Sequence, residues 1–244
     1  YPANRFYGNW NTRLLFPYTD SLYKSDTTTL LNLSAEVSGQ FTFPFNGPVT
    51  STYGWRDSAM HKGIDIDLQR GEQVKAAFDG MVRFAGRSGG YGNVIIIRHY
   101  NGLETVYAHL WKIKAKAGDI VLSGQVVGQG GSTGHSTGTH LHFETRFRGV
   151  AINPGYFFSL ETHILLSDAF QITRTRNGYA AFPAGVEFHN VTKGDNLTEI
   201  SKRYGITVKQ LRLWNNMEGR IRLKAGQQIR VKAPAALTAT RTGY

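Results

Sequence analysis

Four of the eight histidines of this chain lie in three short stretches within one third of its length. His61 precedes Asp65 by four positions, and His140 precedes His142 by two. His109 ends a third, strand-like stretch. Zinc in proteins binds imidazole nitrogen and carboxylate oxygen, and a catalytic zinc keeps one coordination position open for water. These stretches therefore supply the ligands of a catalytic zinc site and leave histidines for proton transfer.

The spacing of these residues suggests how they share one site. Residues i and i+2 of a β-strand point to the same face, so His140 and His142 project together. Gly63, between His61 and Asp65, has no side chain and permits a close backbone approach. We predict three zinc ligands from two strands, namely His61, Asp65 and His142. A structural zinc site usually has four protein ligands including cysteine, and the chain has no cysteine, so a catalytic site is favoured.

The other four histidines carry no such pattern. A single histidine in a β protein is more often an ordinary core or surface residue than a ligand. We interpret four histidines in this way: His99, His135, His163 and His189.

The bulk composition limits the classes of partner. The net charge is +11 and the isoelectric point is near 9.9, which suits a polyanion such as nucleic acid, an anionic membrane surface or a bacterial cell wall. The same charge can also serve solubility alone. No apolar stretch approaches 18 residues, so no transmembrane helix is expected. The chain opens with Tyr1-Pro2-Ala3 and shows no signal peptide, and we interpret it as a mature or trimmed form.

The elements that must position the site are predicted to be strands. Between residues 40 and 156, short apolar runs rich in β-branched residues alternate with Gly-rich turns, which is typical of an antiparallel β domain. The fold class is therefore mainly β. The runs are residues 41–43, 73–77, 80–85, 93–99, 104–108 and 140–144.

The flanking segments have different patterns. Residues 26–37 can form a short helix, whereas residues 164–166 and 170–172 look buried and indicate a packed connector. Towards the C-terminus, Asp195 and Asn196 can cap a helix that runs to Tyr204, and Thr207 can cap a second. Short strands at either end, residues 188–191 and 228–231, complete a compact βααβ unit.

The central region resembles the lysostaphin/LytM-type zinc endopeptidases, the β-lytic metallopeptidases of bacterial cell walls. The resemblance covers about residues 44–157. Its motifs are Ser-Thr-Tyr-Gly-Trp-Arg at 51–56, the stretch 61–65, Gly-Tyr-Gly-Asn at 90–93, Tyr-Ala-His-Leu at 107–110, the Gly/Ser/Thr stretches at 131–138, His-Leu-His-Phe-Glu at 140–144 and Asn-Pro at 153–154.

The resemblance implies a lysostaphin-like antiparallel fold and one zinc ion per chain. It makes His61, Asp65 and His142 the zinc ligands, and His109 and His140 the catalytic histidines beside the metal. An unperturbed histidine pKa near 6.5 suits both a base and an oxyanion donor, so these two roles stay unassigned.

Three further residues near these motifs are weaker candidates. Tyr53 and Asn93 are candidates for substrate positioning, although turn or strand packing is the better explanation for both. Glu144 lies on the same strand face as the histidines, one pleat further, and is expected to support the site or the fold.

The C-terminal unit resembles a LysM module, which binds glycans that contain N-acetylglucosamine. The resemblance rests on His-Asn-Val-Thr-Lys-Gly-Asp-Asn-Leu at 189–197, Ile-Ser-Lys-Arg-Tyr-Gly at 200–205, Leu211, Asn215-Asn216 and Leu-Lys-Ala-Gly-Gln at 223–227. It implies four sugar-facing residues: Gly194, Asp195, Asn196 and Asn215.

The two resemblances divide the chain into five parts. Residues 1–40 form an N-terminal arm, residues 41–160 the endopeptidase domain and residues 161–187 the connector. Residues 188–232 form the LysM domain and residues 233–244 a flexible tail. We expect a monomer that is exported to the periplasm, the cell envelope or the medium.

We predict a zinc endopeptidase that hydrolyses peptide bonds in the stem or cross-link peptides of peptidoglycan, held at the wall by its LysM module. The alternative is a non-catalytic cell-wall-binding regulator or activator of another hydrolase. By resemblance, such proteins have lost metal ligands, and this chain retains every one. A nucleic-acid binder, suggested only by charge, lacks any recognised motif or clustered block of Lys and Arg.

Overall fold

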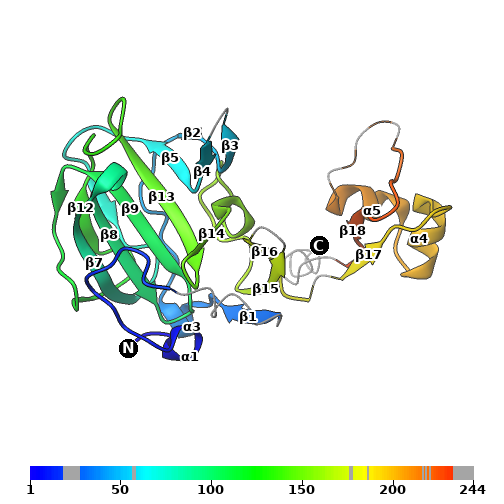
Figure 1. Ribbon diagram of the computed structural model, residues 1–244. Helices are drawn as coiled ribbons and strands as arrows, with labels where there is room; N and C mark the ends of the chain where they lie inside the picture. Colours follow the sequence, from blue (N-terminus) through cyan, green and yellow to red (C-terminus); the bar gives the residue numbers. More distant parts are fainter. Residues whose placement is uncertain are drawn as a thin grey trace, which may run out of the picture. The chain divides into compact units, whose positions relative to one another are not determined.

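A computed structural model of the protein describes residues 1–18, 28–56, 59–175, 178–185, 187–215, 217, 219 and 221–232 (Figure 1). The chain divides into two compact units, Tyr1–Phe182 and Pro183–Tyr244. The tail predicted at residues 233–244 lies outside the described residues. None of the described helices is long and apolar enough to cross a membrane.

An antiparallel sheet dominates the first unit, as the sequence predicts. At one place, strand β14 (Val150–Ile152) pairs with β13 (His140–Phe147) outside the main strand order. Across the sheet, the order is β11 (Ile120–Val121), β7 (Gly80–Ser88), β8 (Gly92–His99), β9 (Glu104–Leu110), β13 (His140–Phe147), β5 (Ile64–Asp67) and β2 (Val49–Ser51).

Smaller elements surround this sheet. The segment 89–91 (Gly89–Tyr91) and the segment 154–156 (Pro154–Tyr156) are short 3-10 turns. A second sheet and a hairpin complete the set: β10 (Lys112–Ile113), β12 (Val126–Gln129) and β6 (Gln73–Lys75), then β3 (Gly54–Arg56) with β4 (Ala59–His61).

One predicted strand does not form. Residues 41–43 make no strand, although Phe43 is buried in the main core and Phe41 packs against it. The ring of Phe41 stacks on that of Phe158 at 4.5 Å, and the backbone N–H of Thr42 donates to the carbonyl of Ala77. Alternating apolar residues therefore mark a buried segment here, not a paired one.

The two faces of the main sheet have different tasks. Leu141 and Phe143 of β13 enter the main hydrophobic core, together with Tyr107 of β9. The alternate residues of β13, including His142 and Glu144, point to the opposite face of the sheet. On that second face, a smaller apolar cluster lies beside them, made of Val94, Ile96, Val106 and Ala108 with Leu15, Phe16, Phe84 and Tyr91 packed against it.

The N-terminal segment, residues 1–18, covers part of this second face (Figure 1). Beneath it lies a fully buried charged cluster, in which Glu104 Oε1 accepts from Arg83 Nε at 2.7 Å and from Arg98 Nε at 3.0 Å. Both guanidinium groups also donate to backbone carbonyls of the segment, at Asn9, Asn11, Leu14 and Leu15, and Arg98 Nη2 donates to the hydroxyl of Tyr18. The segment also contains helix α1 (Asn4–Tyr7).

The short helix suggested for residues 26–37 is wrong for the part that the structure describes. Residues Thr29–Asn32 form strand β1, which pairs with β15 (Ala169–Thr175), and only Ala35–Ser38 is helical, as α3. Leu31 is fully buried while its neighbour Leu30 is 62% exposed, which is the alternation of a strand. Strand β16 (Gly178–Pro183) completes this three-stranded sheet.

Of the two stretches between residues 161 and 187 that we expected to be buried, only one is. Phe170 and Ile172 are fully buried, and Phe170 packs edge-on against Phe157. In contrast, Ile164 and Leu166 are exposed. Strands β15 and β16 therefore belong to the first unit, up to Phe182.

The second unit is the predicted βααβ arrangement. Strands β17 (Phe188–Asn190) and β18 (Gln228–Arg230) pair antiparallel around helices α4 (Leu197–Arg203) and α5 (Val208–Trp214). Thr207 Oγ1 accepts from the backbone N–H of Gln210 at the start of α5. The core of the unit consists of Val191, Ile200, Leu211, Ile229 and Val231.

Candidate metal centre and glycan-binding unit

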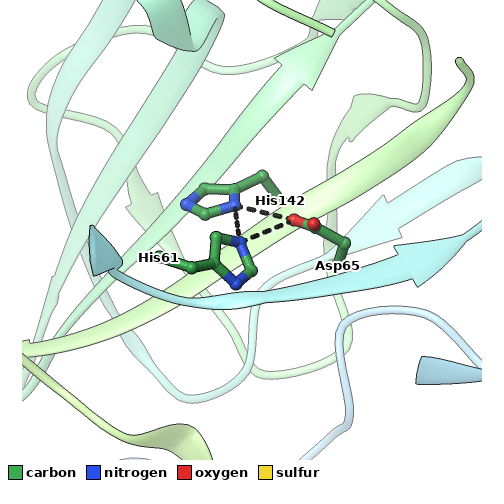
Figure 2. Close-up of side chains that lie close together, drawn as sticks. All are labelled: His61, Asp65 and His142. Carbon is green, nitrogen blue, oxygen red and sulfur yellow. Dashed lines mark hydrogen bonds and ion pairs between the residues drawn. The ribbon is translucent and has the colours of Figure 1, made fainter. Parts of the chain in front are cut away.

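Three predicted ligands meet at one point of the second sheet face (Figure 2). His142 on β13 pairs in register with Asp65 on β5, and His61 ends β4 beside them. Asp65 Oδ1 lies 2.8 Å from His142 Nδ1 and 3.0 Å from His61 Nε2. The two imidazole nitrogens are 3.1 Å apart. This group of one oxygen and two nitrogens could hold a metal ion.

The hydrogen bonds of the outer ring nitrogens fit this arrangement. His61 Nδ1–H donates to the carbonyl of Thr52 at 2.7 Å, and His142 Nε2–H donates to Glu144 Oε1 at 3.0 Å. A bound metal ion would replace the protons through which His61 Nε2 and His142 Nδ1 contact Asp65, and these two nitrogens would then offer it their lone pairs. Ligand atoms on one tetrahedral zinc stand roughly 3.3 Å apart, given bonds of about 2.0–2.2 Å. The donor set and its spacing therefore fit zinc.

Hydrogen bonds within this group shift the pKa values of Asp65 and His142. Burial acts to raise the pKa of Asp65, but hydrogen bonds from His142 and His61 hold it well below its ordinary value. Burial acts to lower the pKa of His142, but hydrogen bonds to Asp65 and Glu144 raise it to about 9. The site therefore keeps a carboxylate and strongly attracts positive charge.

Glu144 anchors the site from below. It is fully buried, and although burial acts to raise its pKa, Arg146 and His142 lower that pKa to about 2. Arg146 Nε donates to Glu144 Oε2, and the Tyr91 hydroxyl donates to Oε1 at 2.9 Å. The ring of Phe16, from the N-terminal segment, lies 3.7 Å from the guanidinium carbon of Arg146. An ionised Glu144 thus fixes the orientation of the His142 ring.

The two other predicted histidines flank the group. His109 Nδ1–H donates to the carbonyl of Thr133 at 2.7 Å, and His140 Nδ1–H donates to that of Gly138 at 3.0 Å. Their ring centroids are 4.8 Å apart, and His140 Nε2 lies 3.8 Å from Asp65 Oδ1. Burial lowers the pKa of His109 to about 4, so its ring is neutral at pH 7.

A glycine-rich loop sets the position of His109. Thr133 Oγ1 donates to the carbonyl of Leu110 at 2.8 Å and accepts from the backbone N–H of Asn93 at 2.9 Å. A Cβ on Gly92 would lie 2.4 Å from the carbonyl carbon of Thr133, so only glycine permits this approach. The motif at 131–134 contained this signal, but the role of Thr133 was not predicted.

A cavity of about 750 Å³ opens over the group, and we call it the metal-site cavity. His135, which we interpreted as an ordinary residue, also lines it. Among the described residues, none of residues 1–40 contributes to its lining. The lining consists of Arg56, Ala59, Met60, His61, Lys62, Asp65, Gly90, Tyr91, His109, His135, Ser136, Thr137, His140, His142 and Glu144.

The two weaker candidates lie outside that lining. The amide of Asn93 donates to the carbonyl of Trp111 at 3.1 Å, between strands. The Tyr53 hydroxyl donates to the carbonyl of Ala151 at 3.4 Å, and its ring lines a neighbouring cavity. The structure thus brings five of the predicted residues together and places these two apart.

In the second unit, the predicted glycan-facing residues make several internal contacts. Asp195 accepts from Thr192 and His189. The Asn196 side chain caps α4 by accepting from the backbone N–H of Glu199 at 3.0 Å. Asn215 bridges α5 and β18 through three hydrogen bonds. Gly194 and Asn196 are exposed, and Gly194 has a φ of 101°.

Comparisons with known proteins agree with both units. Residues 59–154 match the model of peptidase family M23, and residues 189–232 match the LysM domain model. The catalytic domain of the antimicrobial peptidase lysostaphin from Staphylococcus simulans is 36% identical, over 48% of this chain and 93% of that one, with a TM-score of 0.44.

Two relatives are named for different activities. The DD-carboxypeptidase/endopeptidase Mpg of Neisseria meningitidis is 44% identical over 126 residues, which are 50% of this chain and 28% of Mpg. The murein hydrolase activator NlpD of Escherichia coli is 40% identical over 113 residues, which are 46% of this chain and 29% of NlpD. The chain therefore spans less than a third of the length of either relative.

Proposed function

Since the chain contains a peptidase family M23 domain at residues 59–154 and, later in the sequence, a LysM domain at residues 189–232, we propose that it is a zinc-dependent endopeptidase acting on bacterial peptidoglycan. It hydrolyses peptide bonds in the stem or cross-link peptides. The observation that carries this proposal is the meeting of two histidine nitrogens and one carboxylate oxygen in a cavity that two further histidines also line.

His61, Asp65 and His142 hold the zinc in this proposal, and the backbone of Thr52 and the carboxylate of Glu144 orient the two imidazoles. The chemistry that a bound zinc supplies is activation of water near neutral pH and polarisation of the scissile carbonyl.

His109 and His140 act on the attacking water and the substrate beside the metal site. His109 is neutral at pH 7 and has its Nδ1–H engaged with Thr133, so its Nε2 accepts the proton of the attacking water. As the C–N bond breaks, His109 passes this proton to the nitrogen of the leaving amine. His140 has its Nδ1–H engaged with Gly138, so its Nε2 also faces the site and can hydrogen-bond the substrate. Their ring separation of 4.8 Å lets both reach one substrate peptide.

The LysM domain concentrates the enzyme on its insoluble substrate. Tethering raises the effective concentration of substrate at the catalytic site without changing the chemistry there. We propose residues 41–160 as the catalytic region and residues 188–232 as the glycan-binding region, with Gly194, Asp195, Asn196 and Asn215 at the glycan. The net charge of +11 adds attraction to an anionic wall, and the protein works in the cell envelope or outside the cell.

The second candidate function is that of an activator, and the similarity to NlpD favours it. An activator needs no intact metal site. This chain keeps three donor atoms at mutual distances of 2.8–3.1 Å and two further histidines beside them. That geometry supports the enzyme.

Digestion of purified sacculi separates the two functions. The endopeptidase releases cleaved muropeptides by itself, visible by mass spectrometry, and a chelator stops the release until zinc is restored. The His109→Ala protein is the matched inactive control. If products form only after another peptidoglycan hydrolase is added, and form equally with His109→Ala, the protein is an activator.

A further inference from the structure

A second cavity, of about 620 Å³, lies next to the metal-site cavity, and we propose that it binds the sugar chain that carries the peptide substrate. This inference rests on the proposed function, since it names a further part of the same substrate. Four aromatic side chains line the cavity, and we call it the aromatic cavity. They are Tyr53, Trp55, Tyr156 and Tyr179.

The two cavities share one wall. Met60 and Lys62 line both, and Met60 directly precedes the proposed ligand His61 on β4. The ion pair beneath this wall links them as well, because Arg146 lines the aromatic cavity and Glu144 lines the metal-site cavity. A molecule in the metal-site cavity can therefore extend over β4 into the aromatic cavity.

The aromatic lining suits a pyranose ring. Trp55 is 78% exposed and Tyr156 is 40% exposed, so both present ring surface to solvent. A pyranose has an apolar face of C–H groups and a polar edge of hydroxyl groups. Flat aromatic side chains cover the apolar face, and a few polar groups at the rim then bind the edge. Single exposed aromatic residues are common, but several around one cavity indicate a binding site.

Tyr179 and Lys62 supply polar groups to the lining of the cavity. The Tyr179 hydroxyl oxygen is buried and has no hydrogen-bond partner among the described residues. A buried polar group without a partner is costly, and a sugar hydroxyl or acetamido oxygen would satisfy it. Lys62 is exposed at the shared wall and offers three further N–H donors.

The chemistry favours sugar over peptide. Within the described lining, the aromatic cavity has no carboxylate that could pair with an ammonium group of a peptide. Part of the lining comes from the end of β15, at Thr175, and from the start of β16, at Gly178 and Tyr179. These residues lie beyond residues 59–154, which match the M23 family model. The cavity is therefore built partly by residues outside the region that matches the family model.

Two soluble substrates test the proposal in the full-length protein. One is a cross-linked muropeptide that carries its disaccharide, and the other is the same cross-linked peptide without sugar. We expect wild type to have a roughly tenfold lower KM for the first, because stacking on a tryptophan is a typical major contributor to binding. In Trp55→Ala, this difference should vanish through KM, while cleavage of the bare peptide changes less than about twofold.

The matched control is Trp111→Ala. Trp111 is also exposed but lines neither cavity, so its replacement should leave the preference for the sugar-bearing substrate intact. Equal losses on both substrates in Trp55→Ala would mean that the cavity holds peptide, and would overturn the proposal. A wild type that does not distinguish the substrates would overturn it as well.

A direct binding measurement separates this proposal from the proposed function. The indole N–H signal of Trp55 is assigned in NMR spectra by its loss in Trp55→Phe. On addition of the N-acetylglucosamine–N-acetylmuramic acid disaccharide, it should shift to saturation, even if wild type cleaves neither substrate. The signal of Trp214, in the LysM unit, reports sugar binding there independently. An unmoved Trp55 signal at millimolar disaccharide overturns the subsite.

Discussion

At the scale of single residues, the site separates side chains that hold metal from those that move protons. His61→Ala and His142→Ala should each lose most of the bound zinc, because three ligands leave no redundancy. His109→Ala should keep the zinc and lose turnover by roughly 100- to 10,000-fold. Elemental analysis and muropeptide release measure the two effects.

The control for these variants is His163→Ala. The ring of His163 stacks on Phe43 and bonds Asn46, outside the lining of the metal-site cavity. It should change neither metal content nor turnover. Retention of one tightly bound zinc in His61→Ala would contradict the ligand set.

Glu144 should affect the zinc affinity of the site without binding the zinc itself. Glu144→Gln weakens the hydrogen bond that fixes the His142 ring, and loss of such a partner typically lowers metal affinity about 10- to 100-fold. Competition with a chromogenic chelator measures this affinity. Glu36→Gln, at an exposed position of α3, serves as control. An unchanged affinity in a folded Glu144→Gln protein would mean that the ring is held by other contacts.

At the scale of elements, the charged cluster under the N-terminal segment should dominate local stability. Glu104→Gln leaves Arg83 and Arg98 without a carboxylate in a fully buried place. Loss of one partner of a buried ion pair typically costs about 3–5 kcal/mol. Urea unfolding should show this loss, whereas Glu36→Gln should stay within about 0.5 kcal/mol of wild type. A small effect of Glu104→Gln would show that solvent reaches the cluster.

The loop before α4 should make the second unit sensitive to acid. Hydrogen bonds from Thr192 and His189 lower the pKa of Asp195 to about 2, below its unfolded value of about 3.9. The ionised form therefore stabilises the fold above about pH 4, and this contribution is lost as the pH falls towards 2. In urea titrations, NMR signals of Ile200 and Leu211 should show this loss in wild type and not in Asp195→Asn. Equal acid sensitivity of both proteins would assign the effect to other carboxyl groups.

Local sequence patterns predicted one strand face and both helix starts, but elements that depend on distant partners in the chain could not be predicted. The alternation of His140 and His142 predicted one strand face, and Asn196 and Thr207 predicted both helix starts. The strand Thr29–Asn32 could not be predicted because its partner, β15, lies about 140 residues away in the chain. Likewise, Thr133 and Tyr91 gained their roles only when the fold brought them to His109 and Glu144.

At the scale of the whole molecule, the first unit extends beyond the region that carries the catalytic motifs. Phe170 is fully buried against Phe157, so a chain cut after Ser159 loses part of its core. A chain cut after Phe182 should fold and bind zinc, whereas one cut after Ser159 should melt lower or aggregate. Thermal unfolding and elemental analysis of both compare them. Equal melting temperatures would show that β15 and β16 only cover the domain.

The cut after Phe182 also tests the LysM domain. Its turnover on small soluble peptides should match that of the full chain, while its activity on sacculi should fall, because the tether no longer concentrates the enzyme. Sedimentation with sacculi measures binding directly. Unchanged binding and activity would leave the basic charge of the first unit as the means of wall attachment.

The N-terminal segment also has a consequence for the order in which the protein can fold. Its carbonyl groups at residues 9–15 bond to Arg83 and Arg98, about 70 to 90 positions later in the chain. A growing or translocating chain makes the segment first, yet its partners exist only after β7, β8 and β9 have emerged. Closing so long a loop is entropically costly and slows folding. The N-terminal segment must therefore stay undocked until β7, β8 and β9 have formed.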